Sequence, residues 1–318
     1  MAIKTARGLI LYMSRLSKPK KRSILAGLAI VFVIAFLLYG PFDAFRLLWI
    51  NTAIYSSRFK FLATGLYSKA YIQSVLDRNK PSINLKTDTR MVDVLGGDGI
   101  FFAPIKGDYY TGFIIKLENP RRLALVSSNN SQGKLLEELV TEHGAIGGIN
   151  ASGYADHKAS GGAWGITITD GVYISRCYKG TRHVMGGFSR DYKMSVGYFN
   201  EDEIIAQDYL WAFEFGPILI VNGEKLELTA YSGGIAPRTA IGQTSDGAVL
   251  LLVVDGRRIS SIGATYKDIQ TILYANGAIN AIGLDGGSSS TMVYQHEVVN
   301  IPSEGVEGRM LPNAIIFH

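Results

Sequence analysis

The strongest hydrophobic signal in the chain is an uncharged run near its N-terminus. No residue from Ser23 to Phe42 carries a charge. Twenty residues of helix span about 30 Å, which matches the hydrocarbon core of a bilayer. A cleaved signal peptide is the alternative, since a basic segment before an apolar run is common to both, but no small-residue cleavage site follows Leu38. The pattern therefore predicts an uncleaved transmembrane signal anchor over residues 23–42.

The next segment, residues 43–90, combines a helical pattern with a polar linker. Between residues 44 and 76 there is no proline, and apolar or aromatic groups recur at spacings of three and four, which predicts a juxtamembrane helix with one apolar stripe. The stripe would pair with a second copy of the chain, lie on the membrane, or pack on the globular domain. Asn79-Lys80-Pro81-Ser82 ends the helix, and a linker follows up to Arg90.

Residues 91–318 are long enough for one domain with a single core. Short apolar runs such as 110–117 and 123–126 are typical of strands, whereas 133–143 has a helical pattern. We expect an α+β fold with a mixed, largely antiparallel sheet and crossover helices, preceded by the transmembrane and juxtamembrane helices.

Two apolar runs in this domain end in an acidic residue followed by glycine. Residues 248–254 lead into Asp255, and residues 278–284 lead into Asp285. The segment 265–277 between them has a helical pattern, and a strand, a helix and a strand in succession usually form a crossover between parallel strands. Because parallel strands share a direction, both carboxylates are predicted at the same edge of the sheet, where ligands bind.

A hairpin is predicted to bring an arginine to the same place. Residues 238–243 are joined to the strand before Asp255 through Asp246-Gly247, a pair typical of tight turns. An antiparallel pairing would place Arg238 near Asp255. An arginine beside two carboxylates fits either a structural ion pair or bidentate binding of an anionic substrate group.

The charge of the chain is concentrated in its first 22 residues, which hold seven basic residues and no acidic one. Subtracting those seven from the net charge of +5 leaves the other 296 residues near −2. No basic surface remains for nucleic acid, which excludes that class of partner. The positive-inside rule places residues 1–22 in the cytoplasm as a basic tail, and the domain outside it.

Several segments together resemble the phosphodiester glycosidase family, which includes many bacterial proteins linked with exopolysaccharide biosynthesis. The resemblance rests on Pro-Arg-Thr-Ala-Ile-Gly at 237–242, Asp-Gly-Arg at 255–257 and Asn-Ala-Ile-Gly-Leu-Asp-Gly-Gly-Ser-Ser-Ser at 280–290, with further support at 148–154, 216–223 and 309–316. Ala151 and Ser152 stand where the family usually has two glycines, and Ser288 stands where a third glycine follows Asp-Gly-Gly. All three replacements are small, which suits the same backbone path.

The resemblance implies a hydrolase that cleaves a sugar 1-phosphodiester in an envelope or extracellular glycan. The chemistry needs donors for the phosphate and a carboxylate near the anomeric carbon. We expect Asp285 to act as base or nucleophile and Asp255 to orient water or Arg238. Arg238 would bind the phosphate, and the remaining candidates are donors to the substrate: the phosphate-binding Gly286, Gly287, Ser288 and Ser289, and the sugar-binding Asn150 and Asn280.

Two other functions stay open at this point. One is a non-catalytic polysaccharide-binding protein that aids exopolysaccharide assembly. The other is metal-dependent phosphodiester hydrolysis with Asp255 and Asp285 as oxygen ligands. No cofactor is expected, although a divalent cation is compatible with the second alternative. Cys177 is the one cysteine, so no disulfide is expected, and the histidines lack metal-binding spacing, although His157 and His183 fall in loops that could border the site.

Overall fold

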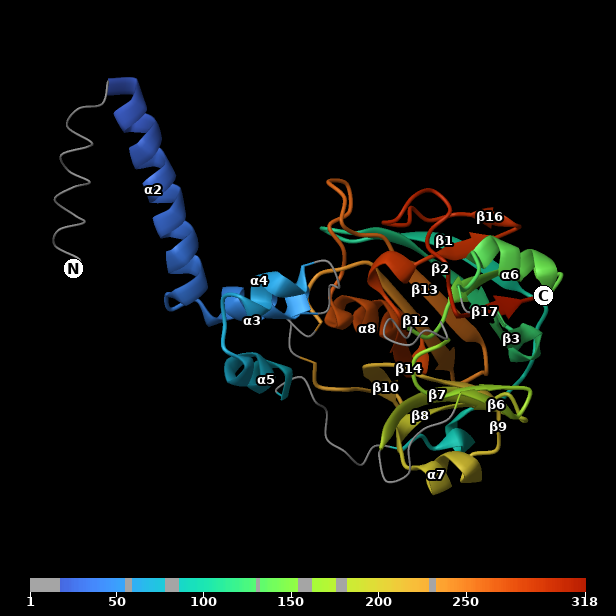
Figure 1. Ribbon diagram of the computed structural model, residues 1–318. Coiled ribbons are helices and arrows are strands. Elements are labelled where there is room, and N and C mark those ends of the chain that lie inside the picture. The colour runs from blue at the N-terminus through green and yellow to red at the C-terminus, as the bar shows by residue number, and fades with distance from the viewer. Residues whose placement is uncertain are drawn as a thin grey trace.

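The computed structural model describes residues 18–54, 59–77, 86–129, 132–153, 162–175, 182–228 and 233–318. A long N-terminal helix is followed by a group of short helices and then by a β-rich domain (Figure 1). The basic tail up to residue 17 and most of the expected linker, residues 78–85, lie outside the described residues, as do Tyr154, His157 and Cys177.

The N-terminal helix α2 (Lys18–Tyr39) covers most of the predicted anchor. Its segment Arg22–Tyr39 is long and apolar enough to cross a membrane, and 6% of that segment is buried. The helix ends where Gly40 and Pro41 follow, since proline cannot continue a helix. Among the described residues, α2 is the one helix with these properties.

The juxtamembrane segment forms three short helices, so the prediction of one continuous helix was wrong. They are α3 (Asp43–Ile54), α4 (Lys60–Thr64) and α5 (Lys69–Asp77). Gly65 caps α4, and the Ser68 hydroxyl accepts a hydrogen bond from the Tyr71 N–H at the start of α5. The apolar side chains pack on each other in a small core of Ile50, Ala53, Ala63, Ile72 and Val75. Of the described residues in the predicted stripe, only Leu62 packs against this core, and Phe59 is exposed, so the buried side of the helices is not the one that the spacing indicated.

The helical unit is tied to both of its neighbours. The Tyr67 hydroxyl donates to the Leu38 carbonyl at 2.9 Å, which joins the unit to the end of α2. On the other side, Thr52 of α3 accepts a hydrogen bond from the Ile235 N–H at 3.3 Å. Gly234 has φ +63°, and a Cβ at that position would collide with Thr52. The unit therefore contacts the β-domain at residues 234–235.

The β-domain contains three sheets, and every strand pairing in them is antiparallel. The seven-stranded sheet has the order β1 (Ile100–Lys106), β2 (Thr111–Leu117), β13 (Val249–Val254), β12 (Arg238–Thr244), β14 (Ala278–Leu284), β10 (Ile218–Val221) and β11 (Glu224–Lys225). The second sheet has the order β16 (Glu297–Val298), β15 (Met292–Tyr294), β4 (Gly147–Asn150), β17 (Asn313–Phe317) and β3 (Leu123–Ser127). The third has the order β6 (Val172–Ser175), β5 (Thr167–Thr169), β9 (Tyr209–Glu214), β7 (His183–Ser189) and β8 (Met194–Phe199).

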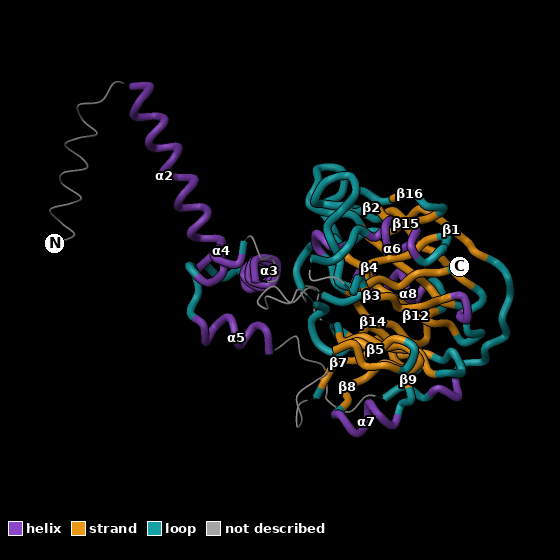
Figure 2. The backbone as a smooth tube through the Cα atoms, turned by 45° about the vertical axis from the view of Figure 1, so that its right-hand side comes forward, coloured by secondary structure: helices purple, strands orange, loops and turns teal. Residues whose placement is uncertain are grey.

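The main core lies between these sheets. Ile115 and Leu251 of the first sheet, Ile149 of the second and Phe213 of the third belong to one buried cluster. The opposite face of the seven-stranded sheet is covered by α8 (Tyr266–Ala275) (Figure 2). The remaining helices are α6 (Leu136–Glu142), α7 (Glu201–Ala206) and the 3-10 turns η1 (Thr89–Met91), η2 (Pro120–Arg122) and η3 (Gly287–Ser289). The expected α+β class with largely antiparallel sheets is confirmed.

The predicted crossover from β13 through α8 to β14 is present, but the two strands are not adjacent, because β12 lies between them. Helix α8 begins at its capping residue Thr265, and its chain connects β13 to β14. These two strands are parallel to each other, because each pairs antiparallel with β12, which lies between them. The carboxyl ends of β13 and β14 and the start of β12 therefore share one edge of the sheet.

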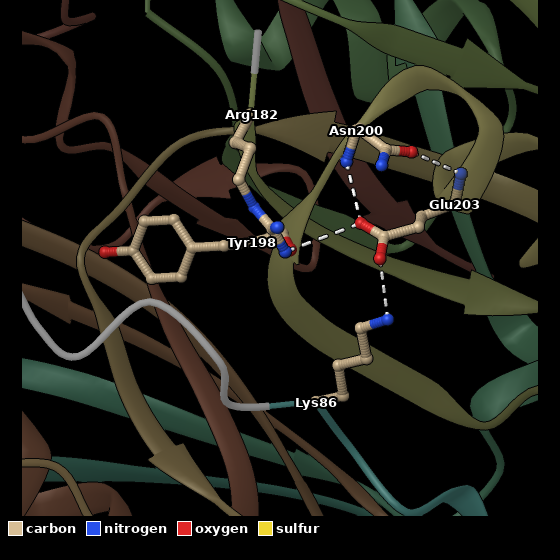
Figure 3. A network of polar contacts seen from close by, with 5 residues as sticks. All are labelled: Lys86, Arg182, Tyr198, Asn200 and Glu203. Carbon is tan, nitrogen blue, oxygen red and sulfur yellow. Dashed lines mark hydrogen bonds and ion pairs between the residues drawn. The ribbon is translucent and has the colours of Figure 1, made fainter. Parts of the chain in front are cut away.

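A polar network fixes the chain where it reaches the β-domain (Figure 3). Glu203 of α7 accepts hydrogen bonds from Lys86 Nζ at 2.7 Å and from the Asn200 N–H at 2.9 Å, and Arg182 Nη2 lies 3.5 Å away. The hydrogen bond from the Lys86 ammonium group is the main reason that the pKa of Glu203 is lowered.

We expect Glu203→Gln to lower the thermal midpoint slightly at pH 7, because the network is solvent-exposed and such ion pairs contribute little. A carboxyl with a lowered folded-state pKa stabilises the fold above its unfolded pKa, and this contribution is lost as the pH falls through the folded pKa. The difference between variant and wild type should therefore shrink on acidification. Melting curves at pH 7 and pH 3 measure it, and an unchanged difference would contradict the role of the charge.

Candidate active site

Three predicted charged residues lie together at the shared strand edge. Arg238 pairs with Val254, the residue before Asp255. Thr239 pairs with Leu284, the residue before Asp285. The start of β12 thus lies between the ends of β13 and β14, as the turn and crossover patterns predicted, although no ion pair joins Arg238 to a carboxylate in the described part of the chain.

Asp285 is half-buried and held on several sides. Its Oδ2 accepts a hydrogen bond from Ser289 Oγ at 2.5 Å, and its backbone N–H donates to the Ala151 carbonyl at 3.0 Å. The other carboxylate oxygen faces Gly153, where a Cβ would lie 3.9 Å from Oδ1. The carboxylate is therefore oriented by Ser289, next to a position that bears no side chain.

The turn after Asp285 is formed by Gly286 and Gly287. Gly287 has φ +64°, and its N–H donates to the Pro237 carbonyl at 2.9 Å. That bond occupies a backbone donor that we expected to serve the phosphate. Ser289 Oγ is likewise bonded to Asp285, whereas Ser288 is half-buried and no hydrogen bond engages its hydroxyl in the described part of the chain.

Two guanidinium groups lie close to this glycine turn. A Cβ on Gly286 would lie 3.7 Å from Arg238 Nη1, and a Cβ on Gly287 would lie 2.9 Å from Arg257 Nη2. Two positive charges close to a turn without side chains provide a place for an anionic group beside Asp285. Arg257 follows Asp255 in the Asp-Gly-Arg motif, but it was absent from the predicted site.

Arg238 is buried, and most of its donors are already used. Nε donates to the Ala264 carbonyl at 3.1 Å, and Nη2 donates to the carbonyls of Gly233 and Gly234. The guanidinium lies 4.0 Å from the centroid of the Tyr266 ring. Nη1 is the nitrogen nearest the glycine turn, so Arg238 both holds the 233–234 loop and places Nη1 at the site.

Asp255 has a different environment from the one we predicted. Its side chain is buried, and Oδ1 accepts hydrogen bonds from Asn300 Nδ2 at 3.0 Å and from the Ile301 N–H at 2.9 Å. Burial raises the pKa of this carboxyl, although the two hydrogen bonds act in the opposite direction. The contacts show Asp255 positioning the 300–301 segment instead of orienting Arg238.

We expect Asp255→Ala to lower the free energy of unfolding by about 1–3 kcal/mol, because the Ile301 N–H would lose its acceptor. Asp255→Asn keeps an acceptor oxygen and should be as stable as wild type at pH 7. A raised folded-state pKa means that wild-type stability increases as the pH falls between the unfolded and the folded pKa. Denaturant titrations from pH 7 to pH 4 should show this increase in wild type and not in Asp255→Asn.

Of the two asparagines expected to bind the sugar, Asn150 lies beside Asp285 but has its side chain engaged within the fold, whereas Asn280 lies away from the site. Asn150 is fully buried, and its side chain bonds Thr239 Oγ1, the Thr291 N–H and the Asp285 carbonyl. It therefore positions the backbone of Asp285. Asn280 lies five residues earlier on β14, about 16 Å along the strand, and accepts from the Asn222 N–H at 3.0 Å. Strand direction thus excludes Asn280 from this edge.

The site region contains two further polar features, of which sequence reasoning had indicated only His183, as part of a bordering loop; it is instead the first residue of β7. Tyr266, the first residue of α8, places its ring under Arg238; burial raises the pKa of its hydroxyl, and the nearby Asp285 charge raises it further. His183 and Glu214 form a buried pair, with Nδ1 2.9 Å from Oε1. The residue after Glu214, Phe215, packs at Gly153 beside Asp285. Glu214 is the last residue of an apolar strand. An acidic residue at the end of an apolar run is also the pattern by which Asp255 and Asp285 were predicted.

The described residues contain no group of three or more His, Cys, Asp or Glu side chains placed to hold a metal ion. Asp255 and Asp285 follow two strands that are separated by β12, and each carboxylate is bonded to its own separate partners. The metal-dependent alternative would thus require a site with few protein ligands.

The residues of this site fall within a region of the sequence that matches a known protein family. A family model described as phosphodiester glycosidase matches residues 143–318. The SPbeta prophage-derived uncharacterized protein YomE of Bacillus subtilis is 33% identical over 182 residues, covering 54% of this chain and 27% of that protein. N-acetylglucosamine-1-phosphodiester alpha-N-acetylglucosaminidase of mouse is 22% identical over 233 residues, covering 66% of this chain and 45% of that protein. The chain thus spans less than half the length of these relatives.

A solved structure shares the fold. The catalytic domain of zebrafish N-acetylglucosamine-1-phosphodiester alpha-N-acetylglucosaminidase, auto-inhibited by its pro-peptide, superimposes with a TM-score of 0.60 at 20% identity, covering 71% of this chain and 86% of that one. The family model covers more than half of the sequence and includes Asp255, Asp285 and Arg238. The chain belongs to the phosphodiester glycosidase family.

Proposed function

We propose that this protein hydrolyses a sugar 1-phosphodiester in an envelope or extracellular glycan, and that α2 anchors it in a membrane with the β-domain on the extracytoplasmic side. The observation that carries the proposal is the glycine turn after Asp285, which has the Arg238 and Arg257 guanidinium groups close to it. A carboxylate next to an anion-binding turn is what cleavage beside a phosphate requires.

In this mechanism the phosphate lies over Gly286 and Gly287, bound by Arg238 Nη1 and Arg257. The bond between the anomeric carbon and the phosphate oxygen breaks, and the electron pair leaves with the phosphomonoester. Asp285 either takes a proton from the attacking water or attacks the anomeric carbon itself, after which water hydrolyses the sugar ester. Both routes yield free sugar and a phosphomonoester. Ser289 keeps the carboxylate oriented, and Asn150 holds its backbone.

The names of the mammalian relatives suggest the first substrate to test. Full-length protein in detergent micelles would be incubated with an α-N-acetylglucosamine 1-phosphodiester and, separately, with an aryl α-N-acetylglucosaminide. We expect free sugar from the phosphodiester alone, because the arginines contribute only where a phosphate is present. Equal release from both substrates would contradict the role of the arginines. Binding without release would favour the non-catalytic alternative, and loss of release in chelator would favour the metal-dependent one.

A further inference from the structure

Exposed apolar side chains gather around the edge of the sheet that carries the site. They lie on the turn between β1 and β2, on the loop after β13 and on the segment between β16 and β17. Ile259 is fully exposed, Val306 is 86% exposed and Ile262 is 52% exposed. We call the set the apolar rim: Tyr109, Ile259, Ile262, Ile301, Val306 and Met310.

The apolar rim is built on the same residues that form the site. Ser261 Oγ donates to the Asp255 carbonyl at 2.8 Å, and the Ile301 N–H donates to Asp255 Oδ1 at 2.9 Å. Arg258 and Ser261 exchange two backbone hydrogen bonds, which close a tight turn with Ile259 at its tip. The Ile262 N–H bonds the Tyr109 carbonyl at 2.8 Å and joins two parts of the rim. The apolar tips are thus held in fixed positions beside Asp255.

The position of α2 indicates what covers this rim. In Figures 1 and 2, which differ by a rotation about the vertical axis, the upper part of the β-domain, with its loops and with β1 and β16, lies level with the lower, C-terminal part of α2. In Figure 1 these include the orange loop that follows β13. The Thr52 contact to Ile235 and the Tyr67 contact to Leu38 connect α2 to the β-domain through the helical unit. A bilayer around α2 would therefore extend toward the apolar rim.

The composition of the rim suits the boundary between headgroups and acyl chains. Aliphatic side chains and a tyrosine stand at loop tips, with Arg258 beside Ile259. Asp108, Glu304 and Glu307 lie on the same segments, so attraction to anionic lipids is balanced by acidic residues and the apolar side chains carry the contact.

We propose that the apolar rim rests in the surface of the bilayer that holds α2, and that the site takes a lipid whose headgroup is a sugar 1-phosphodiester. The substrate part rests on the proposed function, whereas the membrane contact does not. With the rim in the membrane surface, a headgroup linked through its phosphate to a lipid reaches the glycine turn without leaving the bilayer.

The membrane contact is tested by fluorescence on the full-length chain. In a Cys177→Ser background, Ile259→Cys carries an environment-sensitive fluorophore, and the protein is reconstituted in phosphatidylcholine vesicles that contain nitroxide-labelled lipid. Ile205→Cys is the matched control, because Ile205 is 60% exposed and lies on α7, next to the third sheet. We expect quenching of the probe at position 259 and little at 205. Equal quenching at both positions would overturn the contact.

The substrate class is tested by turnover in the same vesicles. The double variant Ile259→Asp, Ile262→Asp should lose at least tenfold in turnover of a lipid-linked sugar 1-phosphodiester while keeping its turnover of a short-chain soluble one; Ile205→Asp should change neither. Equal loss on both substrates would mean that the rim shapes the site, and would overturn the proposal. If wild type cleaves neither substrate, the proposed function fails, and the quenching experiment still decides the membrane contact.

Discussion

Asp285→Asn is expected to lower kcat/KM for a sugar 1-phosphodiester by about 10²- to 10⁴-fold, the usual contribution of a positioned acid or base. The amide is nearly the same size as the carboxylate and can keep the Ser289 bond, since its oxygen accepts from Oγ. The backbone bonds to Ala151 and Asn150 do not involve the side chain. We therefore expect this variant to lose catalytic activity while its melting temperature stays unchanged.

Ser289→Ala is the matched variant for this prediction, because it leaves the carboxylate and removes only the group that orients it. Its loss should be much smaller than that of Asp285→Asn. Initial rates over a range of substrate concentrations separate kcat from KM for both variants. Undiminished turnover by Asp285→Asn would show that the carboxylate has no part in the reaction.

The sequence predicted that Arg238, Asp255 and Asp285 lie close together, but it did not predict the groups to which their side chains are hydrogen-bonded. Apolar runs that end in Asp-Gly, with a hairpin and a helix between them, determine strand direction, and direction alone places Arg238 between Asp255 and Asp285. The acceptors of Arg238 come from the 233–234 loop and Ala264, and Asp255 binds the 300–301 segment. The spacing of apolar residues along the chain carries no information about contacts between loops that are so far apart in the sequence.

For the segment predicted to be juxtamembrane, the residue pattern predicted the helical structure correctly but the number of helices wrongly. Its spacing of apolar residues is helical throughout, so one long helix was predicted. The described residues contain three helices; Gly65 and Ser68 provide the ends that separate α4 from α5, and the short helices bury apolar side chains against each other. The local residue pattern predicted that the segment is helical. The arrangement of the segment as separate short helices depends on contacts between residues far apart in it, such as Ile50 and Val75.

Arg238→Met is expected to have the largest effect on stability, lowering the free energy of unfolding by about 2–6 kcal/mol. The carbonyls of Gly233 and Gly234 would lose their donor, at about 1–3 kcal/mol each when left buried without one. The Ala264 carbonyl would be less affected, because the Ala236 N–H also donates to it at 3.2 Å. Urea titration of the full-length chain in micelles would measure the change.

Arg238→Lys separates the structural role of this residue from its role at the phosphate. An ammonium group keeps the charge and can bond one or two of the carbonyls, so part of the stability should return. It cannot hold the loop and also reach the glycine turn, where Arg238 now places Nη1. We therefore expect kcat/KM for the phosphodiester to stay at least tenfold below wild type at a temperature where the variant is fully folded. A lysine variant with wild-type kcat/KM would show that Nη1 does not bind the phosphate, and would leave Arg257 as the cation at this turn.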